Sequence, residues 1–96
     1  MRHVVAAAIG FASIAAAVVA SAEPPAGAAS CSGCHPSSAR VSSPVPRIVG
    51  LDRAAIVRAM HDFRSGTRTG TVMDRIAKGF TEEEIQAIAA WYAAQK

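Results

Sequence analysis

Both cysteines of this 96-residue chain lie in one short stretch, Cys31-Ser32-Gly33-Cys34-His35. Below roughly 70–80 residues a single core rarely supplies more than ~3–5 kcal/mol, so natural domains of this size add a disulfide, a metal, a cofactor or a partner. The group that this stretch holds therefore constrains how the rest of the chain folds.

The first 22 residues have the pattern of a cleaved secretory signal peptide. Met1-Arg2-His3 is short and basic, residues 4–20 form an uncharged run rich in Ala and Val, and Ala20-Ser21-Ala22 fits the cleavage pattern. An uncleaved membrane anchor is the alternative, but the run is shorter than the ~20 residues that a spanning helix needs. We expect residues 23–96 to form one domain in the periplasm, with no membrane span after cleavage.

The composition argues against a nucleic-acid partner and for a thin core. Ten Lys and Arg face seven Asp and Glu, and the basic side chains are scattered without interleaved aromatics. The hydrophobic fraction of 51% rests largely on the leader and on alanine. We therefore expect a bulky apolar group to complete the core.

Periodicity predicts an all-α chain with long loops, and no segment alternates as a strand would. One helix is predicted to begin after Asp52 as N-cap and to stop at Gly66. Its apolar residues recur at spacings of three and four, at Ala55, Ile56, Ala59, Met60 and Phe63. A serine- and proline-rich loop over residues 37–46 precedes it.

The C-terminal third predicts a helical turn and a second long helix. The turn spans Met73 to Lys78 and is closed by Gly79. Thr81 and Glu84 form a capping box, and the acidic residues 82–84 suit the positive end of the helix dipole. The expected buried stripe of this helix is Ile85, Ile88, Ala89 and Tyr92.

Three readings of the cysteine stretch leave part of it unexplained. A disulfide between Cys31 and Cys34 would close a very small loop and stabilise the chain little. A thioredoxin-type redox pair lacks its usual βαβ context. A zinc site would have two cysteines and His35 but no second pair of ligands to complete a tetrahedron.

The fourth reading also explains the histidine, because C-x-x-C-H is the attachment sequence of c-type haem. On a helical turn the two-residue spacer lets Cys31 and Cys34 reach both vinyl groups on one porphyrin edge as thioethers. The imidazole of His35 then reaches the iron. One covalent haem c per chain would also fill the core, and export matches the compartment where such attachment takes place.

A second axial ligand has three candidates in the mature chain, Met60, His61 and Met73. Met60 lies on the apolar stripe of the predicted middle helix, where a packing role is favoured. His61 points about 100° away from it, toward the polar side. Met73 lies outside the long helices, where the chain is free to place a thioether at the iron, so Met73 is the predicted ligand.

These features resemble the class I cytochromes c. The likeness rests on "CSGCH", on "VPRIVGL" at residues 45–51 and on "VMDRIAKGFTEEEIQAIAAWYAAQ" at residues 72–95. Within that class the sequence is similar to the cytochrome subunit of flavocytochrome c sulfide dehydrogenase, also through "FRSGTR" at residues 63–68.

The resemblance implies a small class I cytochrome c fold, with about three to four helices wrapped around one covalent haem. It implies that Cys31 and Cys34 hold the haem and that His35 and Met73 are its axial ligands. It also implies that the carbonyl of Pro46 accepts the Nδ1 proton of the histidine.

Three further features concern this comparison. Trp91 and Tyr92 stand where the family packs aromatics between its terminal helices. The chain departs from the pattern at Pro36-Ser37-Ser38, where relatives often have a Gly-rich loop. It has one C-x-x-C-H, whereas some relatives of this subunit carry two haems.

The expected function is one-electron transfer, with no catalytic residue on this chain. The resemblance implies an FAD-containing flavoprotein subunit that oxidises sulfide as electron donor, and a periplasmic electron acceptor. A free-standing periplasmic shuttle is one alternative. A haem gas sensor or an enzyme with a labile sixth ligand is the alternative of another class.

Overall fold

The structure, a computed structural model, describes residue 10 and residues 23–96. The predicted signal peptide falls on residues that, except for residue 10, lie outside this part, and the boundary at residue 23 stays a prediction. The elements within residues 23–96 are α1 (Ala28–Cys31), α2 (Arg53–Ser65), α3 (Met73–Ile76), the 3₁₀ turn η1 (Ala77–Gly79) and α4 (Glu82–Ala94). All are helical, and no strand occurs in this range, which confirms the all-α prediction.

Helix α2 begins and ends where the sequence predicts. The carboxylate of Asp52 accepts a hydrogen bond from the backbone N–H of Ala55 at 3.2 Å. Gly66 ends the helix with a φ of 81°, a left-handed conformation that favours glycine. The predicted apolar stripe is correct at Ile56, which is buried, but wrong at Ala55, which is exposed although it lies in the same turn, because no neighbouring element covers it.

Helix α4 carries the predicted capping box. The hydroxyl of Thr81 accepts from the backbone N–H of Glu84 at 3.2 Å, and the Glu84 carboxylate accepts from the backbone N–H of Thr81 at 3.0 Å. Both bonds satisfy amides that an uncapped helix would leave open. The whole predicted stripe is buried, at Ile85, Ile88, Ala89 and Tyr92.

The core is one small cluster of buried residues from three helices. It consists of Ala28 of α1, Ile56 of α2 and three residues of α4: Ile88, Ala89 and Tyr92. Among the described residues, only three large side chains are less than 5% exposed, namely Ile85, Ile88 and Tyr92. The core that the side chains make is therefore as thin as the composition predicts.

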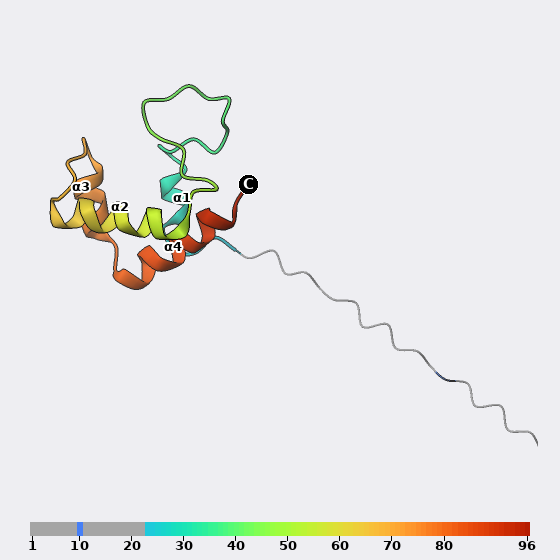
Figure 1. The fold of residues 1–96 in the computed structure, drawn as a ribbon. Helices are drawn as coiled ribbons and strands as arrows, with labels where there is room; N and C mark the ends of the chain where they lie inside the picture. The colour runs from blue at the N-terminus through green and yellow to red at the C-terminus, as the bar shows by residue number, and fades with distance from the viewer. Residues whose placement is uncertain (1–9, 11–22) are drawn as a thin grey trace, which may run out of the picture.

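Figure 1 shows how the elements are arranged. α2 and α4 pack on each other, α3 and η1 pack on α2, and α1 packs on α4. In this view α1 and α3 stand near opposite ends of α2, and the chain between α1 and α2 forms an open ring above the body. In the part of the chain that the structure describes, no helix has the length and apolar character needed to cross a membrane.

Candidate functional site

The cysteine motif lies on a continuous helical turn. α1 begins after Gly27, which has a φ of 85°, and ends at Cys31. The carbonyl of Cys31 then accepts from the backbone N–H of Cys34 at 3.2 Å and from that of His35 at 2.9 Å. These bonds extend the helical path through the two-residue spacer. The side chains of Cys31, Cys34 and His35 therefore project from about one helical turn.

Both thiols are free, with Cys31 half-buried and Cys34 exposed. Burial is the main cause that raises the pKa of Cys31 above its ordinary value, which keeps this thiol protonated at neutral pH. Zinc binding and thiol–disulfide exchange both need a thiolate. Among residues 10 and 23–96, no three His, Cys, Asp or Glu side chains are grouped as a metal site would need. The missing group of ligands disfavours the zinc interpretation. The raised pKa of Cys31 disfavours the redox interpretation, because redox-active cysteines have a lowered thiol pKa.

The imidazole of His35 is oriented by Pro46, as the resemblance implies. Its Nδ1 lies 2.5 Å from the carbonyl oxygen of Pro46. A carbonyl can only accept, so Nδ1 carries the proton and donates. The other ring nitrogen, Nε2, is then the unprotonated one and has the lone pair that a metal ligand needs.

Met73 is the first residue of α3 and is half-buried. It follows Gly70, where an added Cβ would lie 3.3 Å from the Cβ of Met73 and 3.0 Å from the ring of Phe63. The absence of a side chain at Gly70 therefore lets this turn close tightly. α1 and α3 do not pack on each other, so His35 and Met73 come from separate parts of the fold.

The other two ligand candidates belong to α2. Met60 is half-buried inside the helix. His61 is 45% exposed, and its Nε2 donates to the carboxylate of Glu82 at 2.6 Å. The polar orientation predicted for His61 is confirmed, but this link to α4 was not predicted, because nothing in the sequence pairs residues 21 positions apart.

Several large apolar side chains remain exposed next to these elements. Leu51 precedes α2, Val72 precedes α3 and Ile76 ends α3, and all three are between 43 and 51% exposed. A large flat apolar ring would remove such surface from water, at about 25 cal/mol per Å². Two thiols on one turn and an imidazole with Nε2 available fit a haem c, and the thin core leaves these apolar side chains without cover of their own.

Sequence analysis missed two long-range bonds around this site. The Nε of Arg47 donates to the carbonyl oxygen of Ser37 at 2.8 Å, beside Pro46. The hydroxyl of Tyr92 donates to the carbonyl of Ala28, just before the motif. Backbone carbonyls have no sequence signature, so no pattern could reveal either partner.

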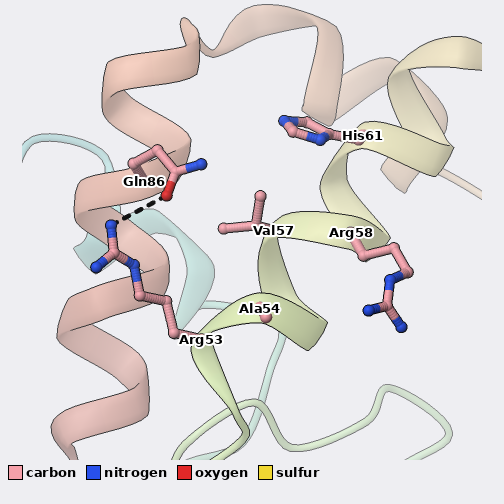
Figure 2. A pocket seen from close by; sticks show the side chains of 6 residues that line it. All are labelled: Arg53, Ala54, Val57, Arg58, His61 and Gln86. Atoms are coloured by element: carbon pink, nitrogen blue, oxygen red, sulfur yellow. Dashed lines mark hydrogen bonds between the residues drawn. The ribbon is translucent and has the colours of Figure 1, made fainter.

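A surface hollow of about 410 Å³ lies elsewhere, between α2 and α4 (Figure 2). Val57 lies within it, Arg53 donates to the side-chain oxygen of Gln86 at 3.0 Å, and the side chain of Arg58 points away from Gln86. The lining residues are Arg53, Ala54, Val57, Arg58, His61 and Gln86, and none is a predicted site residue. The hollow holds no nucleophile beside a base, so its residues suggest no reaction.

Comparison with known proteins gives the same family as the motif. The chain is 48% identical over 63 residues to the cytochrome subunit of sulfide dehydrogenase of Chlorobaculum tepidum, covering 66% of this chain and 57% of that protein. It is 35% identical over 65 residues to a thiosulfate dehydrogenase electron acceptor of Stutzerimonas stutzeri, covering 66% of the chain and 30% of the relative. No family model matches the chain.

A third relative is cytochrome c4 of Pseudomonas aeruginosa, 30% identical over 70 residues. The match covers 72% of this chain and 35% of that protein. The chain thus spans between about a third and just over half of the length of these relatives. The motif, the all-helical fold and these likenesses agree: the chain belongs to the class I cytochromes c, whose cofactor is a covalently bound haem c.

Proposed function

We propose that this protein transfers single electrons through one haem c held by Cys31 and Cys34, with His35 and Met73 as axial ligands. The observation that carries the proposal is the bond from His35 Nδ1 to the Pro46 carbonyl, at the end of the turn that holds both thiols. This bond leaves Nε2 as the atom that would bind the iron, and it fixes the orientation of the imidazole ring.

The chain's own residues explain why such a site would transfer electrons without binding substrate. The bound haem c supplies an iron that alternates between two oxidation states. Pro46 accepts the hydrogen bond from Nδ1–H of His35, which increases the basicity of the ring and fixes its orientation. The thioether of Met73 would be a soft ligand, which would favour the reduced iron and raise the potential. With His35 and Met73 both bound to the iron, no position would be left for a substrate.

We further propose that the electron donor is the FAD-containing flavoprotein subunit of a sulfide dehydrogenase, and that the electron acceptor is a periplasmic carrier. The support is the likeness to a cytochrome subunit of sulfide dehydrogenase. The N-terminal pattern of residues 1–22 supports a periplasmic location. A diffusing shuttle is the second candidate, favoured by the likeness to an electron acceptor of thiosulfate dehydrogenase.

The first experiment tests the haem and its state. The protein is expressed with a cytochrome c maturation system, and haem staining of a denaturing gel follows covalent attachment. We expect staining in the parent, none in the Cys31→Ala/Cys34→Ala double variant, and reversible one-electron reduction of the parent. Rapid carbon monoxide binding to the reduced parent would contradict the six-coordinate site and favour the gas sensor.

The second experiment separates the two partner hypotheses. Native purification at low and high salt identifies the proteins that remain bound. A permanent subunit stays with an FAD-containing flavoprotein in high salt, and sulfide then reduces its haem. A shuttle makes a weak, polar and salt-sensitive contact, so it elutes alone and its reduction rate falls as salt increases.

A further inference from the structure

The loop between the cysteine motif and α2 has little support of its own. Residues 37–44 are all exposed, and Figure 1 shows this segment as an open ring whose two ends come together near α1. The hydrogen bonds within the ring join residues at most three positions apart, such as the one from Val41 N–H to the Ser38 carbonyl at 3.3 Å. These bonds do not connect one side of the ring to the other.

Two hydrogen bonds do connect the sides. His35 Nδ1 donates to the Pro46 carbonyl, and Arg47 Nε donates to the Ser37 carbonyl at 2.8 Å. They span 11 and 10 positions and lie next to each other, because Ser37 is two residues after His35 and Arg47 directly follows Pro46. The bond of Arg47 therefore joins the two ends of the loop next to the Pro46 carbonyl, which accepts the hydrogen bond of His35.

From this geometry we infer that Arg47 is a positioning residue for His35. The inference rests on the proposed function, since it concerns the ring that would bind iron. The guanidinium holds the two sides of the loop together, and this keeps the carbonyl of Pro46 aimed at Nδ1. Without that bond the loop gains freedom, and the Pro46 carbonyl spends part of its time away from the imidazole.

Apart from the bond of Arg47, only the chain that follows Pro46 is attached to the rest of the fold. Ile48 and Val49 pack against the core, and the backbone N–H of Gly50 donates to the Tyr92 carbonyl at 3.0 Å. On the other side, residues 37–44 pack on nothing that buries them. The bond of Arg47 to the Ser37 carbonyl supplies the missing attachment for that side.

The decisive measurement is the exchange rate of the His35 Nδ1 proton, followed by NMR in the reduced holoprotein. Arg47→Met removes the donor, so we expect exchange on the order of tenfold faster than in the parent. Arg47→Lys keeps a long donor and should restore slow exchange in large part. Arg40→Met removes the same charge from the same loop, where no hydrogen bond of the side chain is recorded, and should exchange like the parent.

The reduction potential gives a second readout. A weaker Nδ1 bond makes His35 a poorer donor to the iron, which raises the potential. Loss of a positive charge alone lowers it, because a cation favours the reduced centre. Arg47→Met should therefore have a higher potential than Arg40→Met.

Parent-like Nδ1 exchange in Arg47→Met would overturn the inference, and so would a potential no higher than that of Arg40→Met. Failure of the proposed function is seen separately, as a parent without covalent haem or without reversible reduction. The variants all keep Cys31, Cys34 and His35, so haem staining checks that each is loaded before exchange is compared.

Discussion

The hydroxyl of Tyr92 donates a hydrogen bond to the carbonyl oxygen of Ala28, 64 residues earlier in the chain, across a distance of 2.5 Å. Ala28 is fully buried and opens the short helix that ends at Cys31. Burial and the nearby Cys31 raise the pKa of the Tyr92 hydroxyl, so it remains a donor at neutral pH. This bond ties the last helix to the turn that carries the haem motif.

Tyr92→Phe should lower the free energy of unfolding by about 1–3 kcal/mol, because a buried carbonyl loses its partner. The edge-to-face contact with Trp91, with centroids 4.9 Å apart, is kept in this variant. Guanidinium unfolding of the haem-loaded protein measures the change. Tyr92→Leu also loses the ring and should be less stable still, whereas a parent-like value for Tyr92→Phe would mean that the bond contributes nothing.

Met73→Ala should abolish the weak red absorption band that a methionine-ligated oxidised haem gives, and should lower the reduction potential. Covalent haem should remain, since both cysteines are unchanged. Met60→Leu is the matched control, a near-isosteric change in α2 that should cost less than ~1.5 kcal/mol and keep the band. The opposite pattern, with the band lost only in Met60→Leu, would make Met60 the ligand.

Gly27→Ala should destabilise the protein more than the same change at other glycines. Gly27 has a φ of 85°, and an added Cβ would lie 2.5 Å from the ring of Phe80. Gly66 has a φ of 81° with nothing within 4 Å, so Gly66→Ala measures the backbone strain alone, about 1–2 kcal/mol. Gly79 has neither feature, and Gly79→Ala should be neutral or slightly stabilising.

Thermal unfolding of the three alanine variants should therefore rank them with Gly79→Ala most stable and Gly27→Ala least. Equal losses at Gly27 and Gly66 would show that Phe80 moves aside without cost. A Gly27→Ala protein that folds and loads haem like the parent would mean that the left-handed start of α1 is dispensable.

Local signals allowed the helices of this chain to be predicted. Asp52, Gly66 and the pair of Thr81 and Glu84 act within one turn of their own position, so their effect can be read from neighbouring residues. The cysteine motif could likewise be found from the sequence, because the covalent attachment of a haem c requires a fixed spacing of two cysteines and a histidine. The roles of these residues as haem ligands stay proposals.

Contacts between distant segments were not predictable in the same way. Arg47 and Tyr92 donate to backbone carbonyls, which every residue has, so the partner depends on how the segments come together. The error at Ala55 has a related cause. Periodicity gives the angle of a residue around the helix, but whether that position is covered depends on which neighbouring element lies beside it.

Acid should weaken the capping box at the start of α4. The hydrogen bond from the backbone N–H of Thr81 is the main cause that lowers the pKa of Glu84 below its ordinary value. As pH falls through the ordinary range of a glutamate, the unfolded chain takes up the proton before the folded chain does. The contribution of Glu84 is therefore fully present above that range and is lost as pH falls through the lowered pKa.

Glu84→Gln tests this, because glutamine can still accept from Thr81 but does not titrate. Its thermal stability should fall less than that of the parent between about pH 5 and pH 3, where glutamates take up protons. Glu83→Gln removes the same charge from the same turn, has no recorded side-chain bond, and should keep the acid dependence that Glu84 provides. If the parent and Glu84→Gln lose stability in parallel, then the Thr81 bond does not distinguish the charged from the neutral carboxyl, and the capping box acts only through its geometry.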